Sequence, residues 1–142
     1  MIKKDFIKRK ITLIQDEMIK LSDLAKYTID EVAKDFVKQA AVERILERII
    51  ARAIDINQHI VAESEKKNIS APKDYKETFT ALVDLGVYDK NFAEEISKSV
   101  GTRNMLAHEY DKMDYSKVYN SMGDCLRDYN KYCEFILKFL EK

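Results

Sequence analysis

Apolar side chains recur every three or four residues along most of the chain, the spacing that places them on one face of an α-helix. The first such stretch covers residues 3–26, and a second covers roughly residues 38–66. Each pattern predicts a long amphipathic helix whose apolar face packs against other helices. The apolar positions of the first are Ile7, Ile11, Ile14, Met18, Leu21 and Ala25, and those of the second are Val42, Ile45, Ile49, Ala53, Ile56 and Ile60.

Polar residues mark a short helix and a loop beside these stretches. Thr28, with Glu31 three residues later, has the form of a capping box and predicts a short helix that ends near Asp35. Residues 67–74 contain the only proline of the chain, Pro72, and are the clearest loop in the sequence.

Two further helices are predicted after this loop. Asp74 and Glu77 have the spacing of a cap and open the first, which is expected to end at Gly86 because glycine readily adopts the left-handed conformation. Asp89 is expected to cap the next helix, which runs towards His108. The expected inward-facing residues are Phe79, Leu82 and Val83 in the first helix, and Phe92, Ile96 and Val100 in the second.

A last long helix is predicted to begin at Asp114 or Ser116. Its apolar positions are Val118, Met122, Cys125, Tyr129, Tyr132, Ile136 and Leu140. The patterns predict an all-α fold, an antiparallel helical bundle of four to five main helices, in which residues 1–142 form a single domain.

The composition supports this prediction and narrows the classes of function. The 142 residues include only 3 Gly and 1 Pro, too few for the many tight turns of a β-sandwich or barrel. The 25 basic and 25 acidic residues give a formal net charge of zero. This balance excludes a polybasic protein that binds nucleic acid through bulk charge, but it is compatible with a local basic site.

The sequence also bears on compartment and on the cysteines. No apolar run is long enough to span a membrane, and residues 1–10 lack the apolar core of a secretory signal, so we expect a cytoplasmic protein. Cys125 and Cys133 are separated by about 12 Å along a helix, too far for a disulfide. We expect small core or surface residues, since no second Cys or His pair accompanies them to complete a metal site.

Residues 102–110 contain side chains that phosphodiester chemistry uses. His108 can exchange protons near neutral pH. Arg103 offers a planar set of donors to a phosphate and to the charge that develops on it during reaction. Tyr110 can hydrogen-bond a phosphate, stack on a base or accept a covalent modification. This segment is therefore the candidate functional site.

The spacing of Arg103 and His108 constrains how they act together. The two positions are separated by roughly 140° around an α-helix, so they do not share one face of a straight helix. Their side chains meet if the helix distorts before His108, if the long arginine reaches round, or if a second chain completes the site. On the residues alone, charges that complement a helix C-terminus beside a surface tyrosine are the stronger interpretation.

The pattern R-x-x-x-x-H-x-Y, formed by Arg103, His108 and Tyr110, resembles the signature of the HEPN superfamily. Within that superfamily, the chain is most similar to the HepT-like branch of small all-helical toxins. The resemblance covers most of the chain, from about residue 5 to residue 140. It also rests on residues 41–44, 54–60, 85–87, 100–102 and 115–119.

This resemblance implies a homodimeric bundle that acts as a metal-independent endoribonuclease without a cofactor, the toxin of a type VII-like toxin–antitoxin pair. Arg103 and His108 would be the catalytic pair, supported by Asn104. The implied partner is a minimal nucleotidyltransferase (MNT) antitoxin that silences the toxin by adenylylating Tyr110. All these motif positions are intact, which favours an enzyme. The alternative is a HEPN-type dimer that only binds a nucleotidyltransferase or a nucleotide.

Other polar residues have structural and functional interpretations. Asp55 and His59 are helix neighbours, expected to form a structural pair or, alternatively, to support the site or a dimer interface. A charged run in the second long helix predicts an ion-pair ladder on a solvated face, with contact to RNA phosphates as the alternative. Its members are Glu43, Arg44, Glu47, Arg48 and Arg52.

Overall fold

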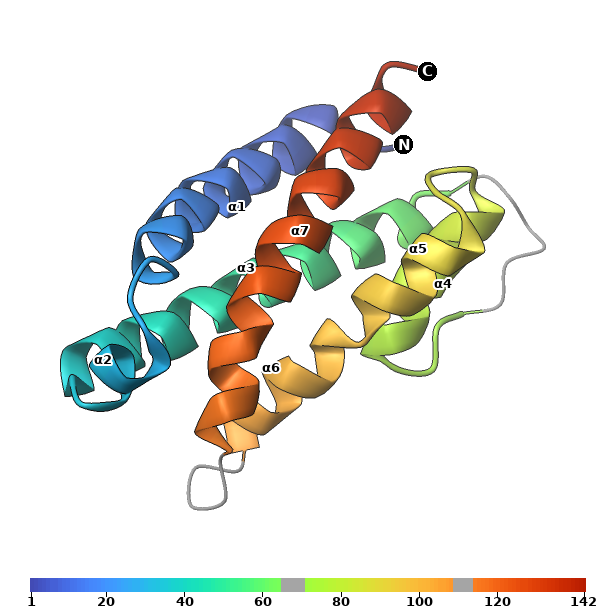
Figure 1. Cartoon of the computed structure of the whole chain (residues 1–142). Helices are drawn as coiled ribbons and strands as arrows, with labels where there is room; N and C mark the ends of the chain where they lie inside the picture. Colours follow the sequence, from blue (N-terminus) through green and yellow to red (C-terminus); the bar gives the residue numbers. More distant parts are fainter. Residues whose placement is uncertain (65–70, 109–113) are drawn as a thin grey trace.

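The computed structural model describes residues 1–64, 71–108 and 114–142, and in these residues it contains seven α-helices and no strand. The helices are α1 (Lys4–Leu24), α2 (Ile29–Ala33), α3 (Phe36–Ala62), α4 (Tyr75–Asp84), α5 (Lys90–Ser97), α6 (Ser99–His108) and α7 (Tyr115–Leu140) (Figure 1). The all-α prediction is confirmed. The helix number exceeds the four to five main helices expected because α2 is only one turn long and one expected helix is divided into α5 and α6.

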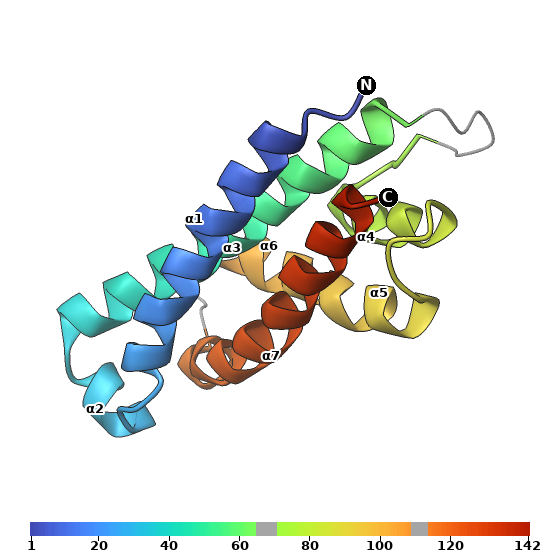
Figure 2. The same ribbon diagram turned by 90° about the horizontal axis from the view of Figure 1, so that it is seen from above.

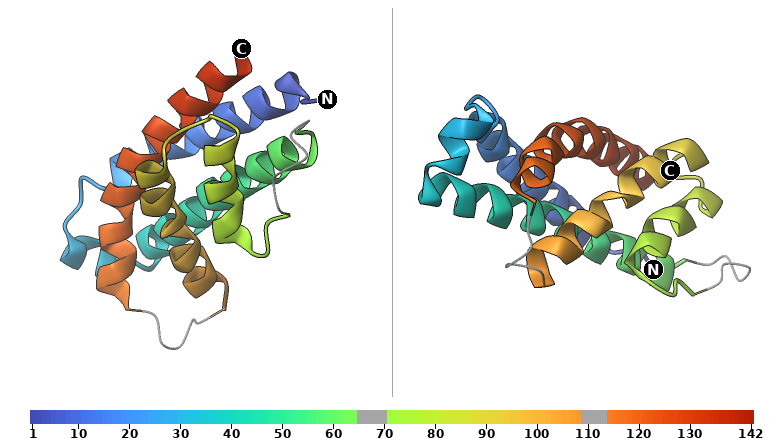
Figure 3. Two further views of the ribbon diagram at one scale, coloured as in Figure 1. Left: turned by 90° about the vertical axis from the view of Figure 1, so that its right-hand side faces the viewer. Right: turned by 60° about the horizontal axis from the view of Figure 1, so that its bottom comes forward.

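The helices form an antiparallel bundle around α3. Helix α1 runs alongside α3 in the opposite direction, and α7 packs against both (Figures 1 and 2). Helices α4 and α6 also pack on α3, and α6 contacts α7 (Figure 3). No helix in the described ranges has the combination of length and hydrophobicity needed to cross a membrane.

Three of the predicted helix boundaries are set by the expected local interactions. The hydroxyl of Thr28 accepts the Glu31 N–H at 3.1 Å, and the Glu31 carboxylate accepts the Thr28 N–H at 3.1 Å, which completes the capping box. Asp114 caps the last helix, because its carboxylate accepts the N–H of Ser116 at 3.0 Å. Gly86 follows α4 with a φ of 80°, as a left-handed helix stop requires.

The long central helix differs from the prediction at both ends. It begins at Phe36 rather than near residue 38, because the Asp35 carboxylate caps it by accepting the Val37 N–H at 3.0 Å. It ends at Ala62 rather than near residue 66. The polar residues that follow Ala62 provide no apolar side chain to bury, so the core gives no reason to prolong the helix.

The core contains the predicted apolar stripes, although Ala25, Val83 and Phe92 are only partly buried. The sequence analysis missed a second apolar face on α3, formed by Leu46, Ile50 and Ile54. All three are buried because α3 packs against α1, α2, α4, α6 and α7 and therefore needs more than one apolar face.

Cys125 and Cys133 are free thiols in the core of α7, only 4% and 2% exposed. Burial raises the pKa of Cys133 to about 12 and raises that of Cys125 well above its ordinary value. Because the thiolate is the reactive form, we expect neither cysteine of the folded protein to react with a thiol reagent at pH 8. Both should react within the same period in guanidinium chloride, and a rapidly reacting native thiol would contradict this prediction. A colorimetric disulfide-exchange assay measures both conditions.

Candidate active site

Helix α6 presents the candidate catalytic residues near its C-terminal end. Asn104 and His108 are exposed and Arg103 is half-buried. The helix continues to His108, so it does not distort between Arg103 and His108. Arg103 and His108 nevertheless line one groove, although they lie on different sides of the helix.

The groove lies between α6 and the start of α4 and has a volume of about 790 Å³. One wall belongs to α6 and the other to the residues at which α4 begins. The residues that line it are Val100, Arg103, Asn104 and His108 on α6, and Lys73, Asp74, Tyr75 and Lys76 on the opposite wall. The motif indicated Arg103, Asn104 and His108 on α6, whereas on the opposite wall the sequence indicated only the cap formed by Asp74.

Arg103 is held by a stacking contact and one long hydrogen bond. Its guanidinium carbon lies 5.3 Å from the centre of the Tyr75 ring, within the range of a cation–π interaction. Its terminal nitrogen donates to the Asn104 side-chain oxygen at 3.5 Å. Its Nε is buried and has no hydrogen-bond partner among the described residues. Among the described residues, the guanidinium therefore forms only this one hydrogen bond.

The start of α4 is fixed by capping interactions. The Asp74 carboxylate accepts the Glu77 N–H at 2.9 Å, and the Glu77 carboxylate in turn accepts the N–H of Lys73. This arrangement confirms the predicted cap and holds the backbone that carries Lys73, Tyr75 and Lys76.

A buried polar network attaches the same turn to the core. The Thr78 hydroxyl donates to the Tyr75 carbonyl at 2.6 Å and accepts the Asn57 side-chain N–H at 3.3 Å. Asn57, which is 0% exposed, also accepts the Tyr132 hydroxyl at 2.6 Å. Contacts therefore run from α7 through α3 to the backbone of Tyr75, on the wall that faces Arg103.

The single helix predicted from Asp89 to His108 is wrong, because the chain bends at Lys98 between α5 and α6. The hydroxyls of Ser97 and Ser99 donate to the carbonyls three residues before them, at 2.9 and 2.7 Å. Two backbone hydrogen bonds at this point also span three residues. The Lys98 N–H is the donor of one, and the Lys98 carbonyl is the acceptor of the other. Serine hydroxyls compete with backbone N–H groups for the carbonyls, and hydrogen bonds that span three residues tighten the turn. Both effects disrupt a regular α-helix.

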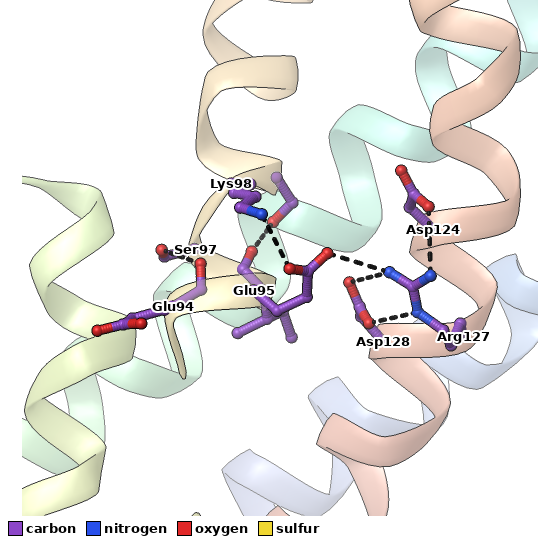
Figure 4. A network of polar contacts seen from close by, with 9 residues as sticks. Glu94, Glu95, Ser97, Lys98, Asp124, Arg127 and Asp128 are labelled. Atoms are coloured by element: carbon purple, nitrogen blue, oxygen red, sulfur yellow. Dashed lines mark hydrogen bonds and ion pairs between the residues drawn. The ribbon is translucent and has the colours of Figure 1, made fainter. Parts of the chain in front are cut away.

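An ion-pair network holds this junction against α7 (Figure 4). Arg127 donates to both carboxylate oxygens of Asp128, at 3.0 and 3.4 Å, and to Glu95 of α5 at 3.3 Å. It also pairs with Asp124 at 3.5 Å. The Lys98 ammonium donates to Glu95 at 2.9 Å, and this hydrogen bond is the main cause of the lowered Glu95 pKa. The network holds the junction from which α6, with the candidate catalytic residues, extends.

Tyr110, the predicted modification site, lies outside the described residues. Tyr115, in the first turn of α7, has a buried hydroxyl with no hydrogen-bond partner among the described residues. Burial, with a smaller contribution from the charge of Glu43, raises the pKa of Tyr115 to about 12. Its phenol is therefore neutral at physiological pH.

His59 has a structural role at the contact between α1 and α3. In the described part of the chain it forms no pair with Asp55. Its Nε2 accepts the Lys3 N–H at 3.0 Å, and its ring centre lies 5.1 Å from that of Phe6. Asp55 instead pairs with Lys10 at 3.2 Å. The predicted Asp55–His59 pair is wrong because both side chains have partners on α1.

The predicted ion-pair ladder on α3 is only partly correct. Arg44 pairs with Glu47 at 3.6 Å along the helix. Arg48 and Arg52 instead reach across to α1, where both donate to the buried carboxylate of Glu17 at 3.4 Å. The sequence analysis missed Glu17 because its partners are distant in the sequence.

Comparison with known proteins places the chain in a family. The family model described as "Ribonuclease HepT-like" matches residues 7–136, which include the α4 and α6 walls of the groove. The chain belongs to the HepT-like ribonuclease family. A member of it, the "tRNA nuclease HepT" of Aphanizomenon flos-aquae, is 31% identical over 137 residues, 94% of this chain and 89% of that protein. The "mRNA nuclease HepT" of Shewanella oneidensis is 25% identical over 103 residues, 72% of this chain and 75% of that protein.

Solved structures share the HepT-like fold of this chain. The tri-AMPylated Shewanella oneidensis HEPN toxin, solved in complex with MNT antitoxin, superimposes with a TM-score of 0.82 at 23% identity over 94% of this chain and 98% of that one. A cytosolic protein of unknown function from Bacillus subtilis, YutE, superimposes with a TM-score of 0.83 at 16% identity over 99% of this chain and 92% of that one. At these identities the likeness is one of fold.

Proposed function

We propose that this protein is a metal-independent endoribonuclease and the toxin of a type VII-like toxin–antitoxin pair. The observation that carries the proposal is that Arg103, Asn104 and His108 line one groove. The nuclease names of the HepT relatives from Aphanizomenon flos-aquae and Shewanella oneidensis support it.

The proposed reaction is attack of an RNA 2′-hydroxyl on the adjacent phosphorus. The bond from phosphorus to the 5′-oxygen of the next nucleotide breaks, which leaves a 2′,3′-cyclic phosphate and a free 5′-hydroxyl. His108 transfers a proton, either from the attacking hydroxyl or to the leaving oxygen. Arg103 stabilises the negative charge that develops on the phosphate oxygens, and the Asn104 amide hydrogen-bonds to the same group.

A homodimer is part of the proposal because each chain offers one histidine to this groove. The reaction needs a base for the attacking hydroxyl and an acid for the leaving oxygen. A two-fold dimer that pairs two copies of α6 would bring two Arg103–His108 sets into one cleft. A purified protein that is monomeric at micromolar concentration would contradict this arrangement.

The proposed partner is an MNT nucleotidyltransferase that adenylylates Tyr110. Tyr110 follows His108 by two residues, so an adenylyl group on it would add bulk and negative charge near the groove. RNA would then be excluded by steric hindrance and by charge repulsion. The AMPylated state of the Shewanella toxin in complex with MNT antitoxin supports this mode of control.

The test is cleavage of total RNA and of transfer RNA by the purified protein in the presence of EDTA. We expect cleavage products that end in 2′,3′-cyclic phosphate. Prior incubation with the cognate nucleotidyltransferase and ATP should abolish cleavage and add the mass of adenylyl groups, and Tyr110→Phe should resist this inactivation. A protein that binds the nucleotidyltransferase but cleaves no RNA would overturn the proposal in favour of a non-enzymatic partner.

A further inference from the structure

The contact between Arg103 and Tyr75 joins the two walls of the groove. Arg103 and His108 are separated by roughly 140° around α6, so the direction of the long arginine side chain decides whether its guanidinium serves the same phosphate as His108. The Tyr75 ring lies 5.3 Å from the guanidinium carbon and is the only aromatic ring that faces it among the described residues. An arginine stacked on a ring keeps its in-plane donors available for a phosphate.

Tyr75 is well placed to hold another side chain because its own backbone is fixed. It is the first residue of α4, directly after the Asp74 cap, and its carbonyl accepts the Thr78 hydroxyl at 2.6 Å. Its side chain is 40% exposed, so the ring lies at the groove surface and is not part of the core.

The same turn makes the groove basic. Lys73 and Lys76 are exposed, line the groove and form no ion pair with a carboxylate in the described ranges. Among the described lining residues, the only carboxylate is that of Asp74, which accepts the Glu77 N–H. Together with Arg103, the two lysines give three cationic side chains and one carboxylate in this described lining, on a chain whose net charge is zero. Such local charge suits a polyanion.

We propose that Tyr75 is a positioning residue that holds Arg103 towards the scissile phosphate, and that Lys73 and Lys76 bind flanking phosphates of the RNA. This inference rests on the proposed ribonuclease function, and it makes the start of α4 the substrate-binding wall opposite α6. The chemistry recognised is the sugar–phosphate backbone, so this wall contributes affinity without reading the base sequence.

Positioning by Tyr75 is tested with Tyr75→Leu and Tyr75→Phe. Loss of the ring should lower kcat about tenfold with little change in KM, whereas phenylalanine, which retains the ring, should stay within about twofold of the wild type. The NMR resonance of the Arg103 Nε–H supplies a readout that needs no activity. Ring-current shielding should displace it in the wild type and in Tyr75→Phe but not in Tyr75→Leu.

The two readouts separate failure of this inference from failure of the proposed function. If the wild type cleaves no RNA, the Arg103 resonance still reports whether Tyr75 holds the guanidinium. If Tyr75→Leu changes neither that resonance nor kcat, the positioning role is refuted while cleavage by the wild type stands. Because Tyr75 is partly exposed, circular dichroism should show native folding of both variants.

Phosphate binding by the lysines is tested with a single-stranded 2′-deoxy oligonucleotide, which lacks the attacking hydroxyl and cannot be cleaved. Lys73→Gln and Lys76→Gln should each weaken binding several-fold and lower the salt dependence of log K by about 0.7. Lys20→Gln is the matched control, because Lys20 is an exposed lysine on α1 outside the groove. Lysine variants that bind with wild-type affinity and salt dependence would refute this part of the proposal.

Discussion

Replacement of His108 by alanine is expected to lower the rate of RNA cleavage about 10²–10⁴-fold, the usual contribution of a positioned acid or base. Replacement of Arg103 by alanine should lower it about 10²–10³-fold, as for removal of a donor that stabilises developing charge. Neither change should unfold the protein, because His108 is exposed and Arg103 is only half-buried. Single-turnover cleavage of a labelled RNA measures both rates, and thermal unfolding checks stability.

Two control variants test whether the loss of cleavage is specific. One replaces the other histidine of the chain, and one replaces the arginine by lysine. His59→Gln preserves an acceptor for the Lys3 N–H and lies outside the groove, so it should cleave at the wild-type rate. Arg103→Lys retains the charge but loses the planar fork, and should recover only part of the activity. The double variant of Arg103 and His108 should be little worse than the poorer single variant, as for groups that act as a unit. Wild-type rates in both single alanine variants would exclude these residues from catalysis.

The parts of the fold that could be predicted are those set by neighbours in the sequence. The capping box of Thr28 and Glu31 and the helix stop at Gly86 need only a few adjacent residues, and both are present. Asp35 is expected near the end of one helix but caps the next. An aspartate between two closely spaced helices is compatible with both roles, so its local sequence does not decide between them.

The features of the fold that could not be predicted from the sequence depend on tertiary contacts. The second apolar face of α3 is buried because five other helices pack on it, which one stripe of periodicity does not reveal. The bend at Lys98 depends on serine hydroxyls that donate hydrogen bonds to backbone carbonyls. Apolar periodicity continues through both α5 and α6, since Ile96 and Val100 are both buried, and so it predicted a single helix.

In the candidate site too, only the residues that are close together in the sequence could be predicted. Arg103, Asn104 and His108 share one short segment, and their residue types and spacing were sufficient to single them out. Tyr75 carried no such signal, because its local sequence indicates only the start of a helix after Asp74. Its relation to Arg103 arises when α4 and α6 both pack on α3. The structure therefore adds the opposite wall of the groove to a site whose first wall could be read from the motif.

The second large effect is expected at Asn57, where substitution by alanine should lower the free energy of unfolding by about 3 kcal/mol. The change removes the nearer of two acceptors of the Tyr132 hydroxyl and the donor to Thr78, and it leaves a cavity at a site that is 0% exposed. For a protein of this size, the melting temperature should fall by roughly 6–12 °C. Urea denaturation monitored by circular dichroism measures the free energy.

A double-mutant cycle separates the hydrogen bond from the lost volume. Asn57→Leu fills the site with an apolar side chain but leaves the Tyr132 hydroxyl with only the Ala53 carbonyl, at 3.2 Å. If the bond between Asn57 and Tyr132 matters, Tyr132→Phe should cost about 1 kcal/mol less in the Asn57→Leu background than in the wild type. Strictly additive effects would mean that the hydrogen bond between Asn57 and Tyr132 adds nothing to stability, and that the cost of Asn57→Ala comes from the cavity and from the lost bond to Thr78.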